Sequence, residues 1–275
     1  MKCLVLGSSG QIGAALAVYL KSQGHQVRSF DIARTSVEDL RNKGIIDDYL
    51  RETDFVFFLA FDVGGSAYLK QYQHTFHFID NNTRLMQATF DSLRRYNKPF
   101  IFASSQMSNM SFSSYGTLKA LGEFYTKTLG GLVVKFWNVY GVEHDPAKTH
   151  VITDFVKRAL TDKEIRMRTD GEEERQFLYA KDCSEALLTL AEQYKNIPRD
   201  KELHITTFKW LKIIDIANII SKLCGNVPVI PGSDKDTVQQ GKRNEPDEYI
   251  LSLWKPTTDI TEGIGEIVKH YQESK

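Results

Sequence analysis

The sequence predicts an α/β protein with a doubly wound parallel sheet and a smaller lobe in the C-terminal half. Three observations carry this prediction. The chain opens on an apolar strand that runs through a glycine turn into a helix, strand-like and helix-like stretches alternate up to about residue 140, and one strand is apolar almost throughout. Alternating βαβ units give parallel sheets with right-handed crossovers, and a strand covered on both faces has no polar alternation.

The individual elements follow in chain order. Strands are expected at 2–6, 26–30, 54–60, 99–103 and 131–136, and helices after the glycine turn and over 82–95 and 115–129. Beyond residue 140 a helix is expected over 151–160, and 225–248 is rich in Gly, Pro and charge and is expected to be a long loop. We therefore divide the chain into a sheet domain, 1–141, and a lobe, 142–275, of which some segments return to the sheet.

Bulk composition excludes several function classes. The 275 residues carry 35 basic and 35 acidic side chains, so no net charge favours nucleic acid as a partner. Three cysteines lie far apart, which argues against a bound metal or a disulfide framework and fits a cytoplasmic protein. The N-terminus has the pattern of a strand rather than of a signal peptide, and no apolar run is long enough to cross a membrane.

The glycine turn is the strongest local signal. Gly7, Gly10 and Gly13 stand in the segment GSSGQIG, directly after the first strand and before the first helix. Glycines let such a turn close tightly, let the backbone approach a phosphate, and let the helix pack close to the strand. The helix then presents free backbone N–H groups to a pyrophosphate. The alternative is a strand-to-helix turn that binds nothing.

The second strand ends in Asp31, about 20 residues beyond the glycines, where a carboxylate accepts hydrogen bonds from an adenosine ribose. The same carboxylate repels a 2′-phosphate, so NAD is predicted as the cofactor in preference to NADP. Arg34 follows closely and would partly offset that repulsion. The part at 1–141 is accordingly expected to be an NAD-binding domain, and the lobe at 142–275 to hold the substrate.

A catalytic group is predicted where Tyr115 and Lys119 stand at i and i+4 of one helix and so share a face. A phenol with a pKa near ~10 is a poor base at neutral pH. A neighbouring ammonium and a positively charged nicotinamide both favour the phenolate. Ser105, at the end of the preceding strand, is placed to hold the same substrate oxygen. The alternative is an ordinary amphipathic helix with a surface lysine.

With these motifs the chain resembles the extended short-chain dehydrogenase/reductases, specifically the NAD-dependent nucleotide-sugar epimerases and dehydratases, which have a Rossmann sheet. The resemblance covers nearly the whole chain through GSSGQIG, DFVFFLA, the ASS strand end, YGTLK, VVKFWNVYG, DGEEERQFLYAKDCSEAL and WKPTTDITEGI. The segments FDVGG, at 61–65, and HDPAKTHVITDFVKRAL, at 144–160, resemble the branch of GDP-fucose synthase and GDP-mannose 3,5-epimerase.

The resemblance implies roles for particular residues. Ser105, Tyr115 and Lys119 match the catalytic triad, and His150 matches a general acid of the fucose synthase type. The expected cofactor contacts are Gly7, Gly10, Gln11, Ile12, Gly13, Asp31, Ile32, Leu59, Ala60, Asn82, Tyr115 and Lys119. The expected substrate contacts are Ser105, Met107, Asn138, His150, Arg175 and Arg243. The helices over 84–96 and 116–129 resemble a pair that forms a homodimer interface.

The chain also departs from its relatives after the catalytic serine. Those that epimerise next to a ketone carry a cysteine where Met107 stands, and a thioether cannot carry a proton. The dehydratases carry an acidic pair where this chain has Gln106 and Met107, which supply neither an acid nor a base. The segment between Ser105 and Tyr115 is shorter than in the relatives. These departures predict against 4,6-dehydration and 3,5-epimerisation.

The sequence thus predicts an NAD-dependent enzyme that oxidises a nucleotide-activated sugar, at C4, through a 4-keto species. Release of the ketone, return of hydride to the other face, and reduction of a 4-keto sugar all remain open. A dinucleotide-binding sensor without catalysis is the alternative of another class. The branch-like segments favour a GDP-linked sugar, and the residues fix neither the base nor the sugar.

Overall fold

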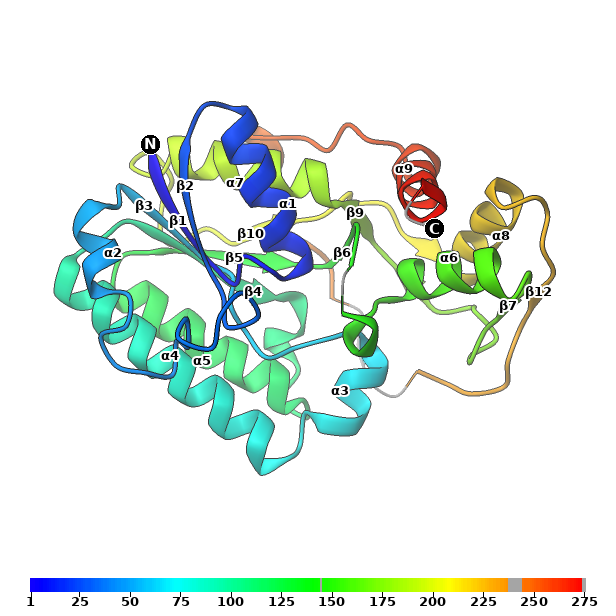
Figure 1. Ribbon diagram of the computed structural model, residues 1–275, viewed down its shortest axis with the longest axis horizontal. Helices are drawn as coiled ribbons and strands as arrows, with labels where there is room; N and C mark the ends of the chain where they lie inside the picture. The colour runs from blue at the N-terminus through cyan, green and yellow to red at the C-terminus, as the bar shows by residue number, and fades with distance from the viewer. Residues whose placement is uncertain (144, 237–243, 274–275) are drawn as a thin grey trace.

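The parallel sheet predicted from the sequence is confirmed. The computed structural model describes residues 1–143, 145–236 and 244–273, and within them six strands pair in parallel in the order β10-β5-β4-β3-β1-β2 (Figure 1). These strands are β1 Lys2–Leu6, β2 Gln26–Phe30, β3 Phe55–Phe58, β4 Phe100–Ser105, β5 Leu132–Phe136 and β10 Leu203–Ile205.

Alternate residues of each central strand enter two different cores. In β1, Leu4 and Leu6 pack into one apolar cluster, whereas Cys3 and Val5 pack into another on the opposite face. The first cluster is covered by α2 Asp47–Glu52, α4 Phe76–Tyr96 and α5 Ser114–Thr128, and the second by α1 Gln11–Ser22 and α7 Ala180–Glu192 (Figure 1). Burial on both faces explains why the central strands are apolar almost throughout.

Capping side chains set the ends of the two long helices. The helix expected from Asn82 already begins at Phe76, because the Thr75 hydroxyl accepts a hydrogen bond from the Phe78 N–H at 3.3 Å. It ends at Asn97, which adopts a left-handed conformation with φ 46°. The Ser113 hydroxyl caps α5 in the same way and accepts from the Gly116 N–H at 3.0 Å.

A third apolar cluster forms the core of the lobe, where α6 Val151–Thr161, α8 Ile213–Leu223 and α9 Ile260–Glu273 pack together. Short strand pairs border these helices: β6 Asn138–Tyr140 with β9 Phe177–Tyr179, β7 Ile165–Arg166 with β12 Val229–Ile230, and β8 Glu174–Arg175 with β11 Leu211–Lys212. The remaining short helices are α3 Ser66–Tyr72, η1 Gln106–Asn109, η2 Pro146–Lys148 and η3 Glu248–Ser252.

The chain returns from the lobe to the sheet twice. Helix α7 packs against α1, and β10 extends the sheet beside β5. The stretch 225–248, expected as a long loop, contains the short strand β12, and its residues 237–243 lie outside the described part. Among the described residues, no helix combines the length and the apolar character that crossing a bilayer requires.

Candidate active site

A groove of about 950 Å³ runs along the carboxyl ends of the strands and between the sheet and the lobe. Open α/β sheets bind their ligands at this edge. Nearly all the predicted site residues line it: Gly7, Gly10, Gln11, Ile12, Gly13, Asp31, Ile32, Leu59, Ala60, Ser105, Met107, Tyr115, Lys119, Asn138, His150 and Arg175. Asn82 is fully buried and is not in the lining, and Arg243 lies outside the described residues.

The glycine turn has the geometry that a dinucleotide diphosphate needs. A Cβ atom on Gly7 would lie 2.6 Å from the Ala60 nitrogen, and one on Gly13 would lie 2.1 Å from the Gly7 oxygen. At Gly10 a Cβ would meet only the Gly7 oxygen, at 3.4 Å, so glycine there keeps the groove clear. Helix α1 has no side-chain cap, and its first N–H groups are therefore left for a phosphate. These features fit a bound NAD.

Asp31 is fixed at the far end of the same groove. Its carboxylate accepts hydrogen bonds from the backbone N–H groups of Ser9, at 2.9 Å, and Ala33, at 2.8 Å. These bonds hold the carboxylate between the glycine turn and the end of β2. Gln11 has a structural contact as well: with its amide turned to satisfy both neighbours, its N–H₂ donates to the Val139 oxygen at 3.1 Å and its oxygen accepts from the Gly141 N–H at 2.9 Å.

Ser105, Tyr115 and Lys119 come together at the end of β4. Burial raises the pKa of Tyr115 to about 12, and a hydrogen bond with Ser105 opposes that rise. The Lys119 Nζ donates to the Ala103 oxygen at 2.6 Å and lies 3.8 Å from the centre of the Phe61 ring. Burial lowers the pKa of Lys119 to about 7, although the Glu123 charge raises it.

This arrangement differs from the simple picture of an ammonium that acidifies its neighbour. The Lys119 Nζ is 5.8 Å from the centre of the Tyr115 ring and is directed to a backbone oxygen. In the chain itself the phenol is therefore a weaker acid than in water. The i, i+4 spacing indicated the shared helix face, but it did not indicate the direction of the lysine head group. The positive charge of oxidised NAD is what remains to lower the phenol pKa.

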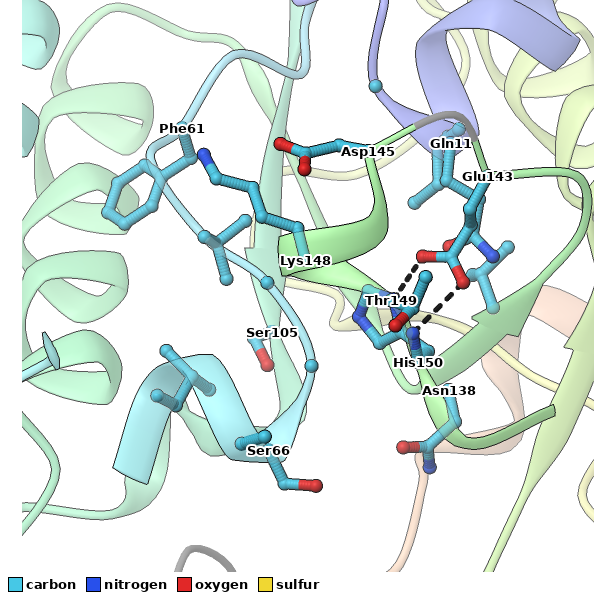
Figure 2. Close-up of a pocket in the computed structure, with 18 of the residues that line it drawn as sticks. Gln11, Phe61, Ser66, Ser105, Asn138, Glu143, Asp145, Lys148, Thr149 and His150 are labelled. Carbon is cyan, nitrogen blue, oxygen red and sulfur yellow. Dashed lines mark hydrogen bonds and ion pairs between the residues drawn. The ribbon is translucent and has the colours of Figure 1, made fainter. Parts of the chain in front are cut away.

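His150 is held by a carboxylate that the sequence analysis did not identify. Its ring Nδ1 lies 2.6 Å from Glu143 Oε1, and its backbone N–H donates to Glu143 Oε2 at 2.9 Å (Figure 2). Burial raises the Glu143 pKa, but the contacts with His150 outweigh burial and lower it overall. The Tyr271 hydroxyl, from α9, accepts a hydrogen bond from the Glu143 backbone N–H at 3.0 Å and donates one to the Glu143 backbone oxygen at 2.8 Å. The pair is thus a fixed acid–base unit on the groove wall.

Two segments meet beside this pair, and we call 61–66 with 145–150 the clasp (Figure 2). The Gly65 N–H donates to the Lys148 oxygen at 3.1 Å, and Lys148 Nζ is 2.9 Å from Asp62 Oδ1. Buried Asn82 accepts from the Asp62 N–H at 2.7 Å and donates to the Asp62 oxygen at 3.1 Å. Asn82, expected as a cofactor contact, therefore anchors the clasp from behind.

The far side of the groove carries the expected substrate contacts. Asn138 donates to the Gln176 oxygen at 3.2 Å. The Arg175 guanidinium is paired with the Asp236 carboxylate. Arg168, which sequence reasoning missed, also lines the groove, and among the described residues its side chain has no partner. Only its position next to a short strand of the lobe could have indicated it.

Gln106, at one position where the chain departs from its relatives, has a partner far along the chain. Asn244 donates its side-chain N–H to the Gln106 backbone oxygen, at 2.9 Å, and to Gln106 Oε1, at 3.1 Å. Gln106, the residue after Ser105, thus contacts the segment that follows 237–243. In the part of the chain that the structure describes, no three His, Cys, Asp or Glu side chains gather as a metal ion would require.

The comparisons with known proteins agree on the family to which the chain is similar. The model of the NAD dependent epimerase/dehydratase family matches residues 3–206. A putative UDP-glucose 4-epimerase of Methanocaldococcus jannaschii is 28% identical over 57% of this chain, and the match spans only 52% of that protein. GDP-mannose 3,5-epimerase 1 of Oryza sativa is 25% identical over 96% of this chain and 80% of its own length.

A solved structure shares the fold. The UDP-glucose 4-epimerase of Thermus thermophilus, in complex with NAD, superposes with a TM-score of 0.81, at 19% identity and with all of both chains covered.

Proposed function

The chain belongs to the NAD-dependent epimerase/dehydratase family, and on this premise we propose that it oxidises C4 of a nucleotide-activated sugar and returns the hydride to the opposite face. The observation that carries the proposal is the group of Ser105, Tyr115 and Lys119 in the same groove as the glycine turn. A 4-epimerase needs no acid or base beside these, because only the ketone has to rotate. Met107 stands in place of a proton-carrying cysteine, which is consistent with a reaction that needs no further acid or base.

Each residue has a chemical task in this reaction. The Tyr115 oxygen takes the proton of the C4 hydroxyl and later returns it, and Ser105 holds the same sugar oxygen. The Lys119 side chain is fixed by the Ala103 oxygen beside the tyrosine, so the charge that favours the phenolate is expected from oxidised NAD. NAD, the cofactor of the family, supplies the hydride acceptor and donor. Phe61 covers the Lys119 ammonium and so helps to exclude water.

The diphosphate of the substrate needs cations on the lobe side. Arg168 is the better candidate than Arg175, because the Arg175 charge is already taken by Asp236. Neither Arg168 nor Arg175 indicates which base the substrate nucleotide carries. Relatives named for UDP-sugars and for GDP-sugars both align with the chain, so the substrate panel has to include both.

A second candidate is reduction of a 4-keto sugar, and the pair of His150 and Glu143 favours it. A histidine with a carboxylate on one ring nitrogen can deliver a proton from the other. Such a reaction uses the same tyrosine and serine in reverse. Incubation with NADH and a 4-keto-6-deoxy sugar nucleotide distinguishes it from epimerisation, since only reduction consumes NADH stoichiometrically.

The test of the lead proposal is turnover. Purified protein is incubated with UDP- and GDP-hexoses, the absorbance of NADH is followed, and products are identified by NMR. Interconversion of C4 epimers, lost in Tyr115→Phe, is the expected result. Tight NAD binding without turnover of any sugar nucleotide would instead support the non-catalytic sensor.

We also propose that the chain forms a homodimer through α4 and α5. Large apolar side chains stand exposed on these helices: Phe76 is 83% exposed and Phe124 is 68% exposed, with Ile79, Leu121 and Tyr125 between 38% and 41%. The two helices pack side by side, so a second copy would complete a four-helix contact (Figure 1). A lone exposed apolar residue needs no explanation, but a helix pair that shares several does.

A further inference from the structure

Two arginines near the adenosine end of the groove are paired with carboxylates of the protein. Arg34 Nε lies 3.4 Å from Glu38 Oε2. Arg41 donates to both oxygens of Asp39, at 2.8 to 3.1 Å. Glu38 and Asp39 line the groove beside Asp31, as does the paired Arg41, whereas Arg34 is not in the lining.

Glu38 is built into the site and is not a mobile surface acid. Its side chain is only 10% exposed. Its Oε2 accepts a hydrogen bond from the Asp31 backbone N–H at 2.8 Å, which ties it to the end of β2. Arg28 also approaches Glu38, at 3.8 Å, but its guanidinium stacks on the Tyr49 ring and donates to the Tyr49 hydroxyl at 3.0 Å.

Arg34 stands where an NADP-binding protein would use an arginine. In such folds an acid after the second strand binds the ribose 2′-hydroxyl, and a nearby arginine accommodates a 2′-phosphate instead. Here Arg34 comes three residues after Asp31, and its Nε lies beside the Glu38 carboxylate. The cation expected to offset part of the repulsion of a 2′-phosphate thus has an acidic partner within the protein.

We propose that Glu38 is a cofactor-specificity residue, which excludes the 2′-phosphate of NADP by pairing with Arg34 and by placing a second carboxylate next to Asp31. Asp31 alone repels the phosphate but leaves a cation three residues away to compensate. Glu38 removes that compensation and adds its own charge. The preference for NAD is thus shared between two acids.

The experiment measures the dissociation constants of NAD and of NADP by calorimetry and needs no sugar substrate, so its outcome is independent of the proposed function. Glu38→Gln keeps an oxygen for the Asp31 N–H but removes the charge. We expect it to lower the NADP dissociation constant about tenfold relative to that of NAD, which corresponds to about 1.4 kcal/mol. Glu38→Ala is measured in parallel and provides the same comparison of dissociation constants if the glutamine variant does not fold.

Two double variants test the mechanism. In the Glu38→Gln background, Arg34→Ala should reduce the gain in NADP binding to the part that comes from the lost Glu38 charge, whereas Arg28→Ala should leave the whole gain, because Arg28 is held by Tyr49. An unchanged NADP-to-NAD ratio in both single variants of Glu38 would overturn the proposal. So would a gain that Arg34→Ala leaves undiminished.

Discussion

Replacing Glu143 with glutamine tests how the protein holds its groove histidine. The Glu143 side chain is 7% exposed, and it takes one hydrogen bond from the His150 backbone N–H and one from Nδ1. Glutamine has the same size, and its oxygen can keep the backbone bond. Its amide then presents an N–H to Nδ1, so that nitrogen has to accept and the ring proton moves to Nε2. The histidine is locked in one neutral tautomer.

The cost to stability can be worked from these contacts. Both hydrogen bonds exchange a charged partner for a neutral one, which together costs about 1.5–3 kcal/mol. The His150 side chain is 40% exposed, and water therefore compensates part of the loss. We take the lower part of that range, about 1.5–2 kcal/mol. For a chain of this size the unfolding midpoint should fall by about 3–8 °C.

The pH dependence has a definite sign. Burial raises the Glu143 pKa, but the bonds and charge of His150 outweigh it, so the folded pKa lies below the usual value of 4.5. A carboxylate with a depressed pKa stabilises the fold at pH above the unfolded value and loses that contribution as the pH falls through the folded one. The difference between wild type and Glu143→Gln should be complete at about pH 6–7 and should shrink as the pH falls below 4.5 toward the folded pKa.

Thermal unfolding followed by circular dichroism at about pH 7 and about pH 4 measures both effects. The matched control is Glu172→Gln, which removes an equal charge from an ion pair with Lys212 at 2.7 Å, where Glu172 is 62% and Lys212 is 44% exposed. Water screens such a pair, so that variant should leave the unfolding midpoint nearly unchanged. If the two variants behave alike, or if the Glu143 effect is the same at both pH values, the assignment of the pair is wrong.

Three further substitutions test other parts of the molecule. Tyr115→Phe should lower kcat at least about a hundredfold and change the NAD dissociation constant less than about threefold, as measured by turnover and calorimetry. Gly65→Ala should lose more than about 2 kcal/mol in chemical unfolding, because its Cβ would lie 2.4 Å from the Thr149 oxygen, whereas Gly265→Ala, with open space around it, should lose nothing. Phe124→Asp should convert a dimer to a monomer in light scattering, and an unchanged mass would refute the α4–α5 interface.

The sequence predicted those features that short-range pattern determines. The first strand, the glycine turn and Asp31 could be predicted because they follow one another at a fixed spacing along the chain. Each of them also meets one geometric requirement of dinucleotide binding. The central strands could be found because burial on both faces removes polar residues, as in β3. The early start of α4 was missed because Thr75 caps the helix well before the apolar periodicity is evident.

Contacts between distant side chains could not be predicted. The carboxylate of Glu143 stands seven residues before His150, and the tyrosine that bonds its backbone lies 128 residues away on α9. Similarly, nothing in the sequence says whether Arg34 turns to the ligand or to Glu38. Such choices depend on rotamers and packing, and these are settled only when the whole chain is folded.

The clasp depends both on two glycines that are evident in the sequence and on a contact with a distant side chain that is not. The backbone of 61–65 can pass close to Thr149 and His150 because Gly64 and Gly65 have no side chains there: a Cβ on Gly64 would lie 3.1 Å from the Lys148 Cα. Asn82, buried behind, fixes Asp62 at both its N–H and its oxygen. The segment that presents His150 is therefore held from the cofactor side of the groove. A change at Asn82 would reach the catalytic groove through this contact and would not have to touch the cofactor.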